Sequence, residues 1–96
     1  MKKGYWVVKA HITDSDEYAK YVSLAGDIVL KYKGRFLVRG GDQDEVEGSG
    51  YERTVMVEFL SYQDAKDCYH SAEYQKALIH TANSSSRYFS IVEGAS

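Results

Sequence analysis

Cysteine, proline and long apolar runs are scarce in this 96-residue chain, and each scarcity excludes a class of protein. The one cysteine, Cys68, excludes an internal disulfide framework and a cysteine-based zinc site. Proline is absent, so no proline-rich linker separates two domains. No apolar run approaches the roughly 20 residues of a membrane span, and the first residues lack the apolar core of a secretion signal. We therefore expect a cytoplasmic protein that does not enter a membrane.

The chain also has no large excess of positive or negative side chains. Twelve Lys and Arg residues stand against fourteen Asp and Glu residues, a net charge of -2, which argues against a general electrostatic grip on nucleic acid or an anionic membrane. Hydrophobic residues make up 44% and charged residues 27%, as in a globular protein. We expect residues 1–96 to form one domain. Because so short a chain buries only about 60–65% of its unfolded surface, oligomerisation is expected.

Hydrophobic periodicity and end signals predict four strands and two helical regions. Residues 5–13 are rich in β-branched and aromatic residues, as in a strand. Asp14 can cap the helix that follows, whose apolar residues recur every three or four positions until Gly34 stops it. A second helical region begins at Ser61 and has a joint where Ser71 can cap a further stretch. The other strands are expected at residues 35–39 with 45–47 as a continuation, 52–59 and 87–93.

The resulting order, β-α-β-β-α-β, indicates a ferredoxin-like α+β fold, with two helices on one face of a four-stranded antiparallel sheet. Alternation in the first strand puts Trp6 on the face that meets the helices and His11 on the opposite face. That opposite face carries too many apolar residues to leave in water. They are Val7, Leu37, Met56, Tyr88 and Val92. A second copy packed sheet to sheet would cover them, so we predict a homodimer.

Several short runs resemble one known family. The runs GRFLVRGG, from Gly34 to Gly41, and YHSAEYQ, from Tyr69 to Gln75, are specific when taken together. Further matching positions spread the likeness over nearly the whole chain: Gly4, Tyr5, Trp6, Tyr18, Tyr21, Glu47, Gly48, Arg53, Glu58, Phe59, Val92, Glu93 and Gly94. On these residues the chain resembles the family called domain of unknown function 1330, within the dimeric α/β-barrel superfamily.

The resemblance implies the fold and the homodimer, and it implies no activity. Related barrels include cofactor-free monooxygenases, isomerases, haem-degrading enzymes and plain binding modules, and the fold does not choose among them. Three positions depart from the family's pattern. Lys33 stands where Gly is common, Ala72 where Pro is usual, and Thr81 near the place where an Arg commonly follows the Tyr-Gln motif. If that Arg holds an anionic ligand in the family, the site is altered here.

His11, Arg39 and Glu58 form the first candidate site. They lie on strands of one sheet, where His11 would be the acid/base catalyst and Arg39 would anchor a small anion by its guanidinium fork. We place Arg39 on the same strand face as Arg35 and Leu37. The alternative is that these charged groups pair with each other across the dimer interface and have no further role.

Aromatic side chains form the second candidate site. Nine tyrosines and one tryptophan are many for this length, and Trp6 and Tyr69 are the ligand-binding candidates, as walls of a pocket between helices and sheet. Core packing is the alternative explanation for most of the inward-facing rings. Cys68 and His70 are two residues apart on a helix, so they point to different sides and do not form a catalytic pair.

No motif predicts a metal or a cofactor. The histidines lack metal-ligand spacing, the acidic residues between positions 42 and 47 lack the order of a calcium loop, and no glycine pattern builds a phosphate-binding loop. Two hypotheses remain open. The first is a homodimer that binds a small polar or aromatic molecule and carries out a cofactor-free oxidation or isomerisation. The second is a non-catalytic ligand-binding or interaction module on the same fold, so the sequence leaves open whether the protein is an enzyme.

Overall fold

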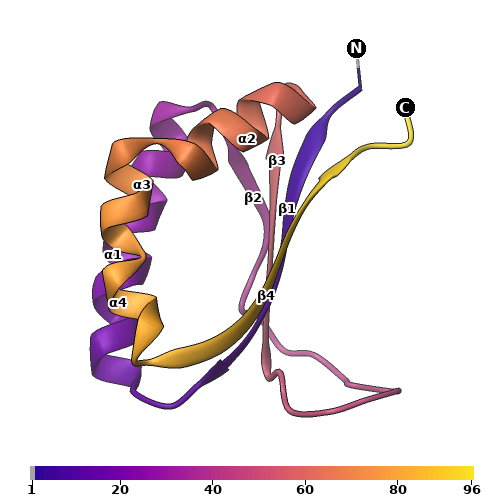
Figure 1. Cartoon of the computed structure of the whole chain (residues 1–96). Helices are drawn as coiled ribbons and strands as arrows, with labels where there is room; N and C mark the ends of the chain where they lie inside the picture. Colours follow the sequence, from indigo (N-terminus) through magenta and orange to yellow (C-terminus); the bar gives the residue numbers. More distant parts are fainter. Residues whose placement is uncertain (1) are drawn as a thin grey trace.

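The computed structural model describes residues 2–96 and has all its helices on one side of a four-stranded antiparallel sheet (Figure 1). The elements are β1 (Gly4–Ile12), α1 (Ser15–Lys31), β2 (Arg35–Arg39), β3 (Arg53–Phe59), α2 (Tyr62–His70), α3 (Ala72–Ala77), α4 (Ile79–Ala82) and β4 (Ser85–Glu93). The strand order is β2-β3-β1-β4. This confirms the predicted ferredoxin-like α+β arrangement. We call the helix-covered side of the sheet the inner face and the opposite side the outer face.

The ends of α1 follow from local chemistry. At the start, the Asp14 carboxylate accepts a hydrogen bond of 3.1 Å from the Glu17 amide, as the sequence predicts. At the end, the Lys33 amide donates to the Leu30 carbonyl and the Gly34 amide donates to the Val29 carbonyl, which is the Schellman arrangement. The residue with a left-handed backbone is Lys33, with φ of 61°, and Gly34 comes one position later.

Gly34 is needed for close packing. A Cβ atom there would lie 2.7 Å from Cγ1 of Val29 and 2.8 Å from Cε1 of Phe59. The chain therefore turns tightly from α1 into β2, and β2 lies at the edge of the sheet.

The predicted joint in the second helical region is confirmed at Ser71. Its backbone is extended, with φ of -63° and ψ of 149°, so it ends α2 and starts α3. Its hydroxyl donates to the Cys68 carbonyl at 2.7 Å and accepts from the Tyr74 amide at 3.2 Å. The helical segments α2, α3 and α4 thus curve over the sheet, and the last of them leads into β4 (Figure 1).

The predicted continuation of β2 at residues 45–47 is wrong. Residues 40–52 contain no strand, and three glycines in this stretch have positive φ: Gly40, Gly48 and Gly50. Such angles interrupt a strand. The segment leaves the sheet at Gly40 and returns at β3, projecting from one end of the molecule (Figure 1).

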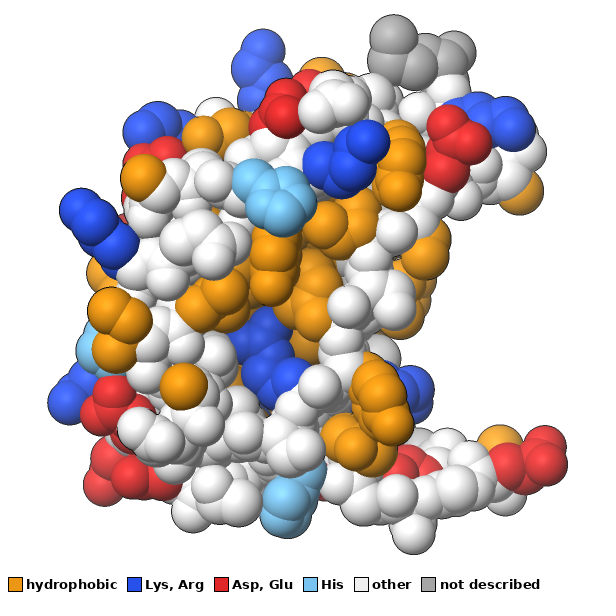
Figure 2. Space-filling view, viewed as in Figure 1, with side chains coloured by type: hydrophobic (Ala, Val, Ile, Leu, Met, Phe, Trp, Pro, Cys, Tyr) orange, Lys and Arg blue, Asp and Glu red, His pale blue; other side chains and the backbone are white. Residues whose placement is uncertain are grey.

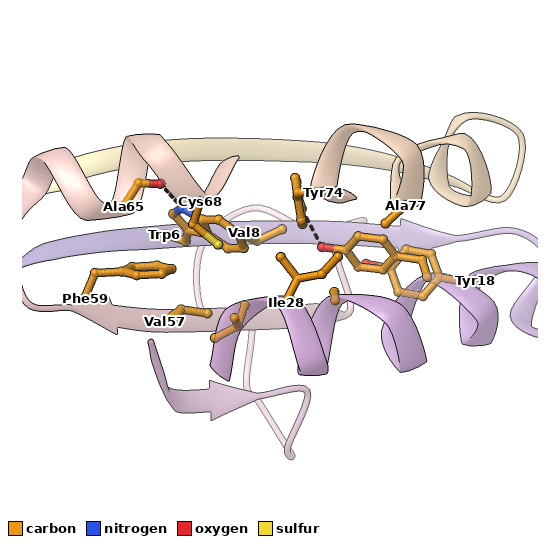
Figure 3. Close-up of a cluster of buried hydrophobic side chains, with 13 residues drawn as sticks. Trp6, Val8, Tyr18, Ile28, Val57, Phe59, Ala65, Cys68, Tyr74 and Ala77 are labelled. Carbon is orange, nitrogen blue, oxygen red and sulfur yellow. Dashed lines mark hydrogen bonds between the residues drawn. The ribbon is translucent and has the colours of Figure 1, made fainter. Parts of the chain in front are cut away.

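The core lies between the inner face and the helices and centres on Trp6, which is 2% exposed (Figure 3). The Trp6 ring packs against Phe59, Tyr74 and Phe89, with centroids 4.8 to 5.1 Å apart. Its Nε1 donates a 2.9 Å hydrogen bond to the Ala65 carbonyl of α2, which satisfies the one polar group of the ring. This contact fixes α2 on β1.

The outer face is uncovered. Leu37, Val38, Tyr88 and Val92 are between 39% and 66% exposed, and the side chains of Val7 and Met56 between them are half-buried. The pairing of β1 with β3 and β4 places Val7, Met56, Tyr88 and Val92 on this face, as predicted. None of the helices between residues 2 and 96 has the length and apolar character that crossing a membrane requires.

Candidate functional site

His11 lies at the end of β1 on the outer face. Its Nδ1 is 3.1 Å from Oε2 of Glu52, and both side chains are about half exposed, at 52% and 51%. The other Glu52 oxygen accepts a 2.9 Å hydrogen bond from the Ile12 amide. This backbone hydrogen bond, together with the neighbouring His11, lowers the pKa of Glu52 to about 2. The pair holds the end of β1 to the start of β3.

Glu58 also lies on the outer face, within a cluster of its own. It accepts a 3.0 Å hydrogen bond from the Tyr5 hydroxyl and a 3.2 Å contact from Arg35, which lies opposite it on β2. The hydrogen bond to Glu58 raises the pKa of Tyr5. The partners of Glu58 are therefore Tyr5 and Arg35, and His11 pairs with Glu52 instead.

Arg39 lies on the inner face, so our expectation that it shares a face with Arg35 and Leu37 is wrong. The reason is a β-bulge: Phe36 is opposite Val57, but Val38, not Leu37, is opposite Met56. One extra residue shifts the alternation, and Arg39 falls opposite Val55.

The guanidinium of Arg39 lies 3.9 Å from the centroid of the Phe36 ring and against Gly26 of α1. His11 and Arg39 are thus on opposite faces of the sheet, and the structure does not bring them together.

The two aromatic candidates have different surroundings. Trp6 is enclosed in the core and, together with Arg39 and Arg53, lines a small pocket of about 30 Å³ beneath α1. That volume holds about one water molecule. Tyr69 is half-buried, packs edge-on against Trp6, and lies 4.9 Å from the Phe89 ring of β4. Its ring reaches a much larger space.

This larger space is a groove of about 380 Å³ between the last helices and β4. We call it the α4–β4 groove. It is lined by Tyr69, Leu78, Thr81, Ala82, Ser85, Arg87 and Phe89. Figure 2 shows it as a hollow between helices and sheet, with apolar walls and a basic side chain at its floor. Thr81 is one of the lining residues, and its hydroxyl donates to the Leu78 carbonyl at 2.8 Å.

The basic residue of the groove, Arg87, and its counterpart Arg53 are missed by our sequence analysis. Ala10 of β1 lies opposite Arg53 on β3 and opposite Arg87 on β4, so the two arginines flank one small residue on the inner face. Each arginine lies on a strand face whose other residues are apolar. On β4, for example, Arg87 shares its face with Phe89 and Ile91. A charge on a stripe that faces the core is a signal that could have identified them.

Arg87 lies among aromatic rings. Its guanidinium carbon is 4.7 Å from the Tyr21 centroid and 5.3 Å from the Phe89 centroid. Nη2 donates a long hydrogen bond of 3.4 Å to the Tyr21 hydroxyl. Nη1 is buried and has no hydrogen-bond partner within residues 2–96. In the described part of the chain no carboxylate forms an ion pair with Arg87 or Arg53.

Tyr21 and Tyr74 join α1 to α3 above these arginines. Their hydroxyl oxygens are 2.6 Å apart, the contact marked at Tyr74 in Figure 3. Burial raises the pKa of the Tyr74 hydroxyl far above its usual value, and the neighbouring Tyr21 adds to the shift. The Tyr74 hydroxyl is therefore a neutral hydrogen-bonding group and not a base at neutral pH.

Cys68 is buried in the core, and burial raises the pKa of its thiol to about 12. His70 on the same helix is exposed and stacks edge-on against Tyr69. Within residues 2–96, no three His, Cys, Asp or Glu side chains gather as a metal ion would need. Neither a thiol nucleophile nor a protein metal cage is thus built from the described residues.

The sheet order, the one-sided helical layer and the exposed outer face define a ferredoxin-like α+β protein. The chain belongs to the family described as a domain of unknown function, DUF1330, which matches residues 3–95. No curated protein sequence matches it.

Three solved structures illustrate the fold. A protein of unknown function from Rhodopseudomonas palustris has a TM-score of 0.77 at 11% identity, over 99% of this chain and 84% of that one. A dimeric ferredoxin-like protein of unknown function from Thermobifida fusca has a TM-score of 0.59 at 10% identity, over 96% and 91%. A candidate antibiotic biosynthesis monooxygenase from Caulobacter crescentus has a TM-score of 0.55 at 15% identity, over 99% and 92%. At these identities the likeness shows the fold alone.

Proposed function

We propose that the protein is a homodimer whose protomers each bind a small molecule with an aromatic or apolar body in the α4–β4 groove. The observation that carries this proposal is the groove itself. Its volume of about 380 Å³ is within the size range of small-molecule sites. Its walls combine the rings of Tyr69 and Phe89 with the aliphatic side chain of Leu78, and one charged group lies at the floor.

The homodimer is supported by the outer face and by one structural neighbour. Two copies packed through this face would cover Tyr88 and Val92 and the half-buried pair Val7 and Met56. The Thermobifida fusca protein is described as dimeric. In a two-fold dimer the same surface of each copy contributes to the interface, so one apolar face on the protomer is sufficient to form it.

Binding, and not proton transfer by the protein, is the activity that the groove supports. Among residues 2–96, its lining includes no His, Asp, Glu, Lys or Cys, and the nearby Tyr74 hydroxyl stays protonated. A reaction in the groove would depend on the reactivity of the bound molecule, with the protein providing orientation and shelter from water. The Caulobacter crescentus neighbour, described as a candidate monooxygenase, keeps an oxidation as the second candidate function. His11 lies on the opposite face of the sheet, so it would take no part in a reaction in the groove.

The proposal is tested by titrating the protein with N-phenyl-1-naphthylamine, an uncharged probe whose fluorescence rises in apolar surroundings. We expect saturable binding, with shifts of the Leu78, Thr81 and Phe89 amide resonances. Ala82→Phe, which places a ring in the groove, should weaken binding at least about tenfold by filling the site. Ala19→Phe adds the same ring to an exposed position of α1 and serves as the control. Absence of binding to the wild-type protein, or equal binding by both variants, contradicts the proposal.

A further inference from the structure

We propose that the molecule bound in the α4–β4 groove is a small organic anion, with a carboxylate or similar group held by Arg87 and reinforced by Arg53. This inference rests on the proposed function and specifies the chemical class of the ligand. It depends on the positions of the two guanidinium groups and on their lack of hydrogen-bond acceptors and ion-pair partners within residues 2–96.

The two arginines occupy related positions on the sheet. Arg53 and Arg87 flank Ala10 across three neighbouring strands, which places their Cα atoms about 10 Å apart. Both side chains extend from the inner face, where the methyl group of Ala10 leaves room between them. Burial raises the pKa of Tyr18 in α1 above them, and the positive charges of Arg87 and Arg53 both oppose that shift. The guanidinium carbon of Arg53 lies 5.9 Å from the centroid of the Tyr18 ring, and that of Arg87 lies 4.7 Å from the centroid of the Tyr21 ring, so both positive charges lie beneath α1.

Within residues 2–96 neither guanidinium group has a full set of acceptors. Nη1 of Arg87 and Nε of Arg53 are buried donors without a hydrogen-bond partner among residues 2–96. Neither arginine forms an ion pair within that range, although Glu17, Glu52, Glu58 and Glu73 all pair with a basic side chain. A half-buried guanidinium without an anion is unfavourable because desolvation is not repaid. An anionic ligand would supply the missing acceptors.

The two guanidinium groups have different surroundings. Gly40 follows β2 and has a positive φ of 72°, and a Cβ atom there would collide with the Arg53 guanidinium. Arg53 therefore lies on the β2 side and acts on the groove only as a more distant charge. Arg87 is held between the rings of Tyr21 and Phe89, which restrict its guanidinium in advance. A guanidinium fixed in this way presents its paired donors to a carboxylate with little further loss of freedom.

Arg87 places a positive charge in the α4–β4 groove. Arg87 lines the groove together with Phe89, Tyr69 and Leu78. A ligand with its apolar body against these three side chains would place its charged end at Arg87. The described groove lining holds no acidic side chain that would repel it. An aromatic or aliphatic carboxylate fits this combination better than a cation or a neutral sugar does.

The experiment compares two probes that differ only by one anionic group: 8-anilinonaphthalene-1-sulfonate and uncharged N-phenyl-1-naphthylamine. We expect the wild-type protein to bind the sulfonate at least about tenfold more tightly. Arg87→Met should weaken the sulfonate about 10- to 100-fold, the range of a charged hydrogen bond, and leave the neutral probe within about twofold. Lys76→Met removes the same charge from an exposed position of α3 and is the control. Displacement of the sulfonate by 1-naphthoate, and not by 1-naphthalenemethanol, would extend the result to carboxylates.

Two further variants keep the test decisive if Arg87→Met is unstable. Arg53→Met should weaken the sulfonate by a smaller factor, about three- to tenfold, because Arg53 adds only a second charge. Arg87→Lys should retain part of the preference, since the charge remains without the fork. If the neutral probe binds and neither arginine affects the sulfonate, the anion site is wrong while the groove stands. If neither probe binds, the groove proposal fails, and the anion site fails with it.

Discussion

Lys33 has a backbone conformation that favours glycine. With φ of 61° it occupies the left-handed position that closes α1, and most residues with a Cβ atom are strained there. Its side chain is exposed, so a change at this position removes no core contact.

We expect Lys33→Gly to raise the free energy of unfolding by about 0.5–1 kcal/mol, because relief of backbone strain exceeds the added flexibility of the unfolded chain. Urea denaturation followed by circular dichroism measures the change. Ala19→Gly is the comparison, since residue 19 is exposed in the interior of α1 and glycine there should lower the free energy of unfolding by about 1 kcal/mol. Destabilisation by Lys33→Gly would show that the backbone at this position is not strained.

At the level of elements, the contact of Glu52 with the end of β1 couples two strands across the sheet. Its carboxylate accepts from the Ile12 amide and lies 3.1 Å from His11. The pKa of Glu52 in the folded protein is about 2, below the usual 4.5. A depressed carboxylate pKa means that this contact contributes stability above pH 4.5 and loses it as the pH falls through about 2.

We therefore expect the Ile12 amide resonance to shift with a midpoint near 2 as the pH falls below 4. Two-dimensional NMR during an acid titration measures this midpoint. Glu52→Gln keeps a neutral acceptor, so it should abolish the titration of the Ile12 resonance. A midpoint near 4.5 in the wild-type protein would mean that the carboxylate is not engaged by the backbone.

The helices and strands were largely predictable from the sequence, whereas the candidate site was predictable only in part. Asp14 and Ser71 start helices because their side chains accept hydrogen bonds from backbone amides three residues further along the chain. Such local interactions can be predicted from the sequence. The bulge at Leu37 was not predictable, because it depends on how β2 pairs with β3. The meeting of Arg53 and Arg87 beside Ala10 likewise depends on the register of three strands. Register joins residues far apart in the chain, and periodicity within one strand carries no information about it.

At the scale of the whole molecule, the exposed apolar residues of the outer face predict a homodimer. Val7 and Met56 lie opposite each other at adjacent strands and are half-buried in the protomer. In a sheet-to-sheet dimer they would be buried further, together with Tyr88 and Val92.

We expect light scattering to give about twice the 10.9 kDa mass of the protomer. Val7→Lys combined with Met56→Lys should reduce the mass to that of a single chain, because buried unpaired charges oppose the interface. Leu24→Lys combined with Leu30→Lys, two exposed apolar positions on α1, adds the same charge away from the sheet and should leave the dimer intact. A wild-type protein that stays monomeric at all concentrations would contradict the dimer, as would a Val7/Met56 variant that stays dimeric.

The buried and unpartnered nitrogen of Arg87 also bears on how this protein can be engineered. A group that is left unsatisfied in the folded chain lowers its stability, and replacing such a charge with an apolar residue often stabilises a protein. Selection of variants for thermal resistance alone would therefore favour loss of Arg87. Such a selection would discard the charged group at the floor of the groove and still return well-folded proteins, so stability and retention of the site have to be screened separately in this fold.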